Sequence, residues 1–177
     1  MDYKFSELPE EELKSVKLNV ASRKDNPTIE GVYYKKLNTI IDGRGDLTEL
    51  WSEPWTESEN VEKNIKHVYF NTTHEGIVKA WHVHEHTTSQ YTCVVGKMQI
   101  VLVDIRPNSK TYGDVNQFII GAKNPSFIRI PPGLLKGWKS LQGDSVIINF
   151  LTSADMKDNF RYPCEVILTD IWEPKNS

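Results

Sequence analysis

The sequence has 177 residues, of which 38% are hydrophobic and 25% charged, a composition typical of one globular domain. The net charge of −3 lacks the basic excess of a general nucleic-acid-binding protein. No apolar run reaches the length of a membrane span, and the first residues contain no apolar signal core. We therefore expect a cytoplasmic protein that binds neither nucleic acid nor membrane.

The N-terminal region is predicted to be a helix followed by a linker. Residues 6–18 mix acidic and apolar side chains, and Pro9 and the glutamates after it are typical of a helix N-terminus. Residues 21–28 are polar and contain Pro27, as expected of a linker. We divide the chain into a helix and linker over residues 1–28 and a β domain over residues 29–177.

From residue 32 onward, short apolar and β-branched runs alternate with turn-forming residues. This spacing predicts an all-β sandwich or barrel. The predicted strands are residues 32–41, 65–70, 77–83, 91–95, 98–104, 118–120, 126–130 and 145–151. Gly96 and Lys97 predict a tight hairpin turn between two of them. The tail from residue 157 reads as irregular and polar.

Three of the five histidines lie close together in residues 76–86. Alternate side chains of a strand share a face, so His82, His84 and, if the strand continues, His86 point the same way. Trp81 then points to the opposite face, where packing in the core is its better interpretation. For the histidines, the residues alone leave open a functional pocket, a metal site or an ordinary strand face.

The spacing around these histidines resembles the first cupin motif, G-x5-H-x-H-x4-E-x6-G. Gly76, His82, His84 and Gly96 match it, and Ser89 stands at the glutamate position. The resemblance implies a cupin-type double-stranded β-helix, a jelly-roll barrel, preceded by a short N-terminal helix.

The second cupin motif, P-x-G-x2-H, matches at Pro131 and Gly133 but has Lys136 at its histidine position. An ammonium group has no lone pair to donate to a metal. We therefore expect no cofactor and no metal. A metal, if one is bound, would be held by His82, His84 and His86.

Four sequence blocks extend this resemblance to the dTDP-4-dehydrorhamnose 3,5-epimerase family. Residues 42–49 are similar to the family's D-x-R-G-x-F-x-E, and residues 76–82 to G-x-L-R-G-L-H. Residues 103–113 are close to V-D-I-R-x-x-S-x-T-[FY]-G, and residues 130–138 to I-P-x-G-x-x-H-G-F. The order of the blocks implies a nucleotide-sugar epimerase, and the family implies a homodimer.

The resemblance assigns roles only where positions match. His82 matches the general base of the family, which removes a proton next to the carbonyl of a 4-keto-6-deoxy sugar. Arg44 and Lys79 match arginines that hold the nucleotide pyrophosphate, and Glu49 matches an acidic residue on the substrate side. His67 and Tyr69 replace a glutamine and an asparagine of the family, so we expect these two residues to bind the substrate through different contacts.

Other functional positions of the family are changed. Ser89 stands where the family has the lysine that stabilises the enolate, so we expect Lys136 to hold the oxyanion instead. Residues 150–156 lack the acid tyrosine of the family. Water, Tyr162 or Tyr91 would then deliver the proton in an epimerase. The aspartate that orients the base is either Asp158 or Asp170.

Two alternatives to an epimerase follow from these changes. A 3,4-ketoisomerase would use His82 and His84 together, because related ketoisomerases carry a similar histidine pair. A non-catalytic cupin would bind the sugar nucleotide without converting it.

Overall fold

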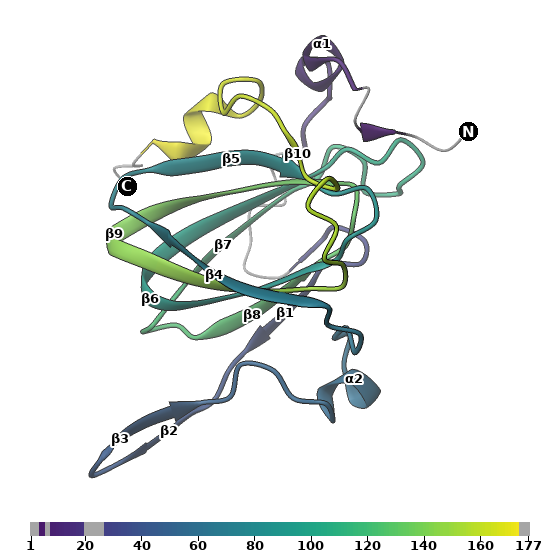
Figure 1. The fold of residues 1–177 in the computed structure, drawn as a ribbon. Coiled ribbons are helices and arrows are strands. Elements are labelled where there is room, and N and C mark those ends of the chain that lie inside the picture. The colour runs from purple at the N-terminus through teal and green to yellow at the C-terminus, as the bar shows by residue number, and fades with distance from the viewer. Residues whose placement is uncertain (1–3, 6–7, 20–26, 174–177) are drawn as a thin grey trace.

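The computed structural model describes residues 4–5, 8–19 and 27–173 (Figure 1). Its main feature is an antiparallel eight-stranded sheet that curls into a barrel, and this confirms the predicted cupin-type all-β fold. The strands of this sheet are β1 (Tyr33–Lys36), β4 (His67–Thr73), β5 (Val78–Val83), β6 (Ser89–Asp104), β7 (Val115–Gly121), β8 (Ser126–Ile130), β9 (Leu134–Leu151) and β10 (Phe160–Arg161).

Two long strands, β6 and β9, run through both walls of the barrel. The first half of β6 pairs with β8 and its second half with β7. The first half of β9 pairs with β5 and its second half with β4. We call the side that contains β4 and β8 the β4 wall, and the side that contains β5 and β7 the β5 wall. Figure 1 shows β5 above and β4 below the interior of the barrel.

The predicted hairpin at Gly96 and Lys97 is wrong, because β6 continues through both residues. Gly96 has φ +71°, and the pairing with β9 shifts register around it. A Cβ atom at Gly96 would lie 2.6 Å from the backbone oxygen of Asp144. A glycine bulge therefore bends the strand from one wall into the other instead of ending it.

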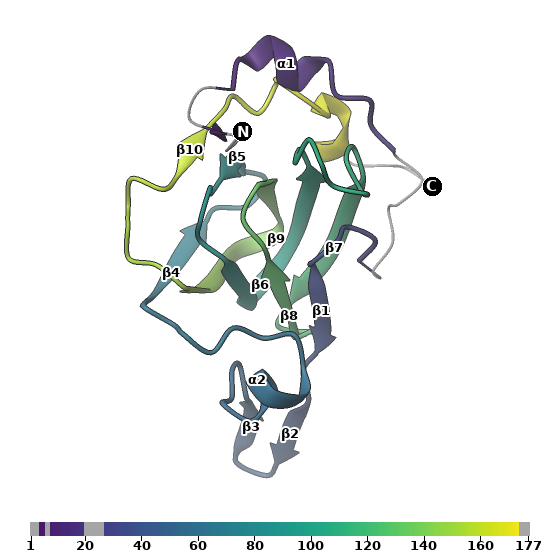
Figure 2. The ribbon, with the colours of Figure 1, turned by 90° about the vertical axis from the view of Figure 1, so that its right-hand side faces the viewer.

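The predicted strand 32–41 is divided in two. After β1 the chain leaves the barrel and forms a separate hairpin of β2 (Thr39–Asp42) and β3 (Gly45–Thr48). A short helix, α2 (Trp55–Ser58), follows it. Figure 2 shows that this hairpin projects from the end of the barrel opposite to α1.

The N-terminal helix is shorter than predicted. Helix α1 spans Glu10–Lys14 and begins directly after Pro9, whereas the prediction covered residues 6–18. Residues 6 and 7 of the predicted helix, residue 20, and residues 21–26 of the predicted linker lie outside the described residues. Neither α1 nor any other helix of the described ranges has the length and apolar character needed to cross a membrane.

Alternation along β6 divides the apolar side chains between two cores. Ile100 and Leu102 face the interior of the barrel, whereas Val101 and Val103 pack on its outside with Trp81. Trp81 is fully buried, as predicted from its position next to His82. Burial of one such side chain stabilises the fold by roughly 2–3 kcal/mol.

The C-terminal tail is less irregular than predicted. Strand β10 pairs with the end of β5, and a 3-10 helix, η3 (Thr169–Trp172), follows it. Ile171 and Trp172 are buried against the outer face of the β5 wall. The tail therefore closes the outer core and brings its own residues to the end of β5.

Candidate active site

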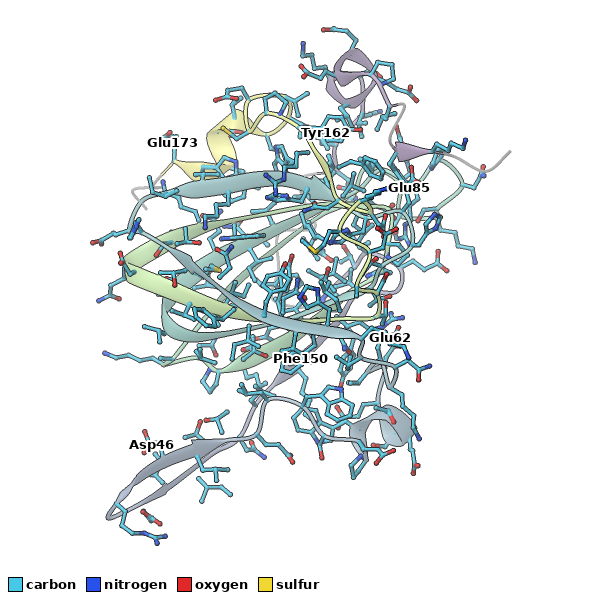
Figure 3. The ribbon with its side chains drawn as sticks, in the orientation of Figure 1. Asp46, Glu62, Glu85, Phe150, Tyr162 and Glu173 are labelled. Atoms are coloured by element: carbon cyan, nitrogen blue, oxygen red, sulfur yellow. The ribbon has the colours of Figure 1, made fainter. Side chains whose placement is uncertain are left out.

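A cavity of about 550 Å³ lies between the two walls. It holds most of the predicted site residues, and Tyr162, labelled in Figure 3, borders it at the tail. Its lining consists of Tyr69, Asn71, Lys79, Ala80, His82, His84, Tyr91, Lys136, Trp138, Asn159, Arg161 and Tyr162.

A bulge in β5 turns both Lys79 and His82 toward this cavity. Strict alternation would direct two residues three positions apart to opposite faces. Lys79 lies opposite Trp138 and His82 opposite Lys136, so β5 has one more residue than β9 between these pairs. The cation at position 79 and the imidazole at position 82 therefore share one wall.

His82 is held as a neutral imidazole on this wall. Its ring stacks on that of Trp138, with ring centroids 5.4 Å apart and planes inclined by 15°. Burial, aided by the positive charges of Lys136 and Arg161 and opposed by Asn159, lowers the pKa of His82 to about 4. Near pH 7 the ring is thus unprotonated and able to accept a proton.

His84 follows the end of β5 and is 8% exposed. Its Nδ1 is hydrogen-bonded to the backbone carbonyl of Asp158, and a carbonyl oxygen only accepts. Nδ1 therefore carries the proton, and the lone pair of the neutral ring is on Nε2. Burial, aided by the charge of Lys136, lowers the pKa of His84 to about 4.

His86 does not join these two histidines. The strand ends at Val83, and the His86 side chain is 83% exposed beside Glu85. In the described part of the chain, no group of three histidine, cysteine, aspartate or glutamate side chains is arranged to hold a metal ion. The described residues therefore do not bring His82, His84 and His86 together as one set of metal ligands.

Lys136 is a buried cation rather than a surface lysine. It is 2% exposed, and its Nζ donates a hydrogen bond of 2.8 Å to Ser89 Oγ. Burial lowers its pKa to about 7, although the carboxylate of Asp158 acts in the opposite direction. Ser89 is where the family has its lysine, so Lys136 brings an ammonium group to that position from β9.

Asp158, one of the two aspartates proposed to orient the base, forms its hydrogen bonds with the loop after β5. Asp158 is 6% exposed and accepts hydrogen bonds from the backbone nitrogens of Glu85 and His86, at 2.7 and 3.2 Å, and from Thr87 Oγ. Burial acts to raise the pKa of Asp158, but these hydrogen bonds outweigh it and the pKa is lowered. Its carboxylate thus fixes the loop after β5.

Asp170 lies exposed on η3. The tail residue that acts on His82 is instead Asn159, whose Oδ1 is buried without a hydrogen-bond partner among the described residues. Asn159 and Arg161 were missed because an irregular tail gives no strand register from which to place them.

The β4 wall contributes Tyr69 to the cavity. The Tyr69 hydroxyl accepts a hydrogen bond of 3.0 Å from Asn149 Nδ2. His67 packs edge-on against the Tyr69 ring at 5.4 Å but does not line the cavity. Lys79 reaches this wall, where its Nζ donates to Asn71 Oδ1 at 2.6 Å and to the Thr72 carbonyl at 2.8 Å.

Arg44 and Glu49 lie outside the cavity of this chain. Arg44 is at the turn of the β2–β3 hairpin, where its side chain is 91% exposed and pairs with Asp42 at 2.5 Å. Glu49 is exposed directly after β3. Figure 3 labels Asp46 on the same hairpin, far from Tyr162 at the cavity.

Comparisons with known proteins agree with this arrangement. Residues 26–162, more than half of the chain, match the family model described as dTDP-4-dehydrorhamnose 3,5-epimerase. The Haloferax volcanii protein named "Probable low-salt glycan biosynthesis epimerase Agl13" is 33% identical over 129 residues, which are 72% of this chain and 81% of that protein. The Bacillus subtilis spore coat polysaccharide biosynthesis protein SpsL is 31% identical over 139 residues, 76% of this chain and 89% of that protein.

A solved structure of ChmJ, a 3'-monoepimerase from Streptomyces bikiniensis in complex with dTDP-quinovose, has the same fold. Its TM-score is 0.74 at 21% identity, with 87% of this chain and 83% of ChmJ covered. With the family match over residues 26–162, the enzyme class predicted from the sequence is confirmed. The chain belongs to the dTDP-4-dehydrorhamnose 3,5-epimerase family of enzymes that act on nucleotide-linked sugars.

Proposed function

We propose that this protein epimerises a 4-keto-6-deoxy sugar linked to a nucleoside diphosphate, with His82 as the base. The observation that carries the proposal is the pairing of two groups in one cavity: a neutral imidazole at His82 and a buried ammonium at Lys136. Removal of a proton next to a carbonyl needs a base for the carbon acid and a positive group for the developing oxyanion.

The two groups divide this chemistry between them. His82 takes the proton from the carbon next to the carbonyl, and the electron pair moves to the carbonyl oxygen to form an enolate. Lys136 forms no salt bridge within the described residues, so its ammonium is available to this oxyanion. In a buried site a preorganised charge of this kind contributes about 10²–10³-fold to the rate.

Two further cations would hold the diphosphate. Lys79 and Arg161 line the same cavity on neighbouring strands β5 and β10. Burial lowers the pKa of Lys79, and a phosphate oxygen next to the ammonium would reverse that effect. Lysine supplies the charge without the bidentate fork that the arginine of the family supplies.

The test is nuclear magnetic resonance of the purified protein with dTDP-4-keto-6-deoxyglucose in deuterated water. We expect deuterium to enter at C3 or C5, and His82→Asn to abolish this entry. His74→Asn is the matched control, because His74 is exposed in the turn between β4 and β5 and does not line the cavity. Entry that persists in His82→Asn would overturn the role of His82. Bound nucleotide without any exchange would favour the non-catalytic alternative.

A 3,4-ketoisomerase is the second candidate, and the hydrogen bond of His84 favours it. With Nδ1 donating to the Asp158 carbonyl, the basic Nε2 of His84 is available for a second proton transfer in the same cavity. His82 and His84 would then move protons along one face of the sugar. A product with its carbonyl at C3, lost in His84→Asn, would distinguish this reaction from epimerisation.

We also propose that the protein is a homodimer in which a second copy covers the β2–β3 hairpin. Ile40, Ile41 and Leu47 are 62–74% exposed on this hairpin, and Phe70 is 70% exposed on the outer face of β4. Large apolar side chains exposed to this degree are typical of an interface. Light scattering should give a dimer for the wild type and a monomer for Ile41→Asp. A monomeric wild type would contradict the proposal.

A further inference from the structure

An epimerase needs an acid on the face of the sugar opposite to its base, and residues 150–156, where the family has its acid tyrosine, contain none. Inversion occurs only if the enolate receives its proton from that opposite face. His82 and Lys136 both lie on the β5 wall, because β5 pairs with the first half of β9. The acid is therefore expected on the β4 wall, across the cavity.

Three tyrosines line the cavity, and two of them are poor acids. The Tyr162 hydroxyl donates its proton away from the cavity, to the Phe5 carbonyl at 2.7 Å and the Leu8 carbonyl at 3.3 Å. Tyr91 is 2% exposed, and burial raises its pKa well above the ordinary range. Neither of the two tyrosines first suggested from the sequence is therefore a suitable acid.

Tyr69 meets the requirement that the other two do not. The inward residues of β4 include Tyr69, and the partner of β4 is the second half of β9, so its ring belongs to the wall opposite His82. Asn149 donates an N–H to the Tyr69 oxygen, which occupies a lone pair and stabilises negative charge there. With the Asn149 amide oriented to donate, no acceptor for the Tyr69 proton is seen among the described residues, so this proton is available to the cavity.

We propose that Tyr69 is the catalytic acid, moved from the family's position to strand β4, with Asn149 as its positioning residue. The proposal rests on the epimerase function proposed above. After His82 has formed the enolate, the Tyr69 O–H bond breaks and a new C–H bond forms on the opposite face of the same carbon. The carbonyl is restored, the phenolate regains a proton from water, and His82 releases its proton to water, so the net change is inversion alone.

The test separates proton removal from proton delivery. In deuterated water, Tyr69→Phe should still incorporate deuterium into the unconverted sugar through His82. Formation of the inverted product should fall about 100-fold or more, the usual contribution of a general acid. Tyr34→Phe is the matched control, because the Tyr34 hydroxyl contacts Ser126 and its ring stacks on Phe118, outside this cavity.

The outcomes distinguish the two proposals. Full product formation by Tyr69→Phe would overturn the role of Tyr69 and leave the epimerase intact. No exchange and no product in the wild type would instead overturn the epimerase function itself.

A fluorinated tyrosine at position 69 keeps the test valid if Tyr69→Phe does not fold. Its phenol is more acidic and nearly the same shape. On the alkaline side, the rate of product formation should begin to fall at a lower pH than in the wild type. The pH dependence of the rate of deuterium exchange should not change. An unchanged pH dependence of product formation would contradict the acid role.

Discussion

The β5 strand and the β2–β3 hairpin both carry family motifs, but only the motif residues of β5 line the cavity of their own chain. On β5, pairing within the barrel brings Lys79 and His82 to the same cavity as Lys136. On the hairpin, Arg44 forms only a local pair with Asp42 and stays in solvent. On β5 a motif residue therefore reaches the cavity through the strand pairing around it, whereas the motif on the hairpin would reach a site only in the proposed dimer.

Replacing Lys136 should produce the largest effect and sharpen this comparison. We expect Lys136→Met to lower kcat about 100- to 1,000-fold, because the developing oxyanion loses the buried cation that stabilises it in the proposed mechanism. Arg44→Met should raise KM and leave kcat nearly unchanged, since it would hold substrate equally before and during the reaction. Steady-state kinetics on both variants would measure the difference.

Stability offers an independent check on the same lysine. Exchanging a buried charge for an apolar side chain of similar volume is often neutral or stabilising. The midpoint of thermal unfolding of Lys136→Met should therefore equal or exceed that of the wild type. A large drop would mean that Lys136 holds the fold together rather than serving the reaction.

Asp158 should give the largest loss of stability among these residues. Asp158→Ala leaves the amides of Glu85 and His86 and the Thr87 hydroxyl without their common acceptor. We expect the free energy of unfolding in urea to fall by about 2–3 kcal/mol. Asp155→Ala is the control, because Asp155 is exposed and, within the described residues, its carboxylate accepts only from the Lys157 nitrogen, at 2.9 Å.

The two buried imidazoles predict a loss of stability in mild acid. In the folded protein His82 and His84 have a pKa of about 4, against an ordinary value near 6.5. Between these values the unfolded chain binds more protons, so the stabilisation is complete above pH 6.5 and is lost as the pH falls toward 4. We expect a loss of about 2 kcal/mol per imidazole. Urea unfolding of the wild type and His82→Asn at pH 7 and pH 4.5 should show a smaller loss in the variant.

The barrel could be predicted from sequence because strand patterns and motif order depend on local residues. The bend at Gly96 could not, because a glycine followed by lysine is compatible with a turn as well as with a bulge. Whether the chain reverses there is decided by Asp144, which comes 48 positions later and lies against that glycine. The same limit applies to the split between β1 and β2.

A site residue was predictable where it stands at the position of the family motif. It was less predictable where the same chemical group comes from another part of the chain. His82 and Lys79 were located from their motif, although only the bulge in β5 explains how both reach the cavity. The contact between Ser89 and Lys136 joins residues 47 positions apart, so no local pattern contains it. Asn159 depends on the path of the tail, which follows from the burial of Ile171 and Trp172.

The smallest effect is expected when the ion pair on the hairpin is removed. This variant tests the difference between β5 and the hairpin most directly. Asp42→Asn removes the partner of Arg44 at a site where the arginine is 91% exposed and solvent screens the charges. In the Ile41→Asp background, which the proposed dimer predicts to be monomeric, we expect no measurable change in the urea midpoint. If the midpoint of Asp42→Asn in the wild-type background instead falls as far as in Asp158→Ala, the hairpin is covered in solution. Its motif would then be working in a neighbouring copy, and Arg44 would join the residues that act on substrate.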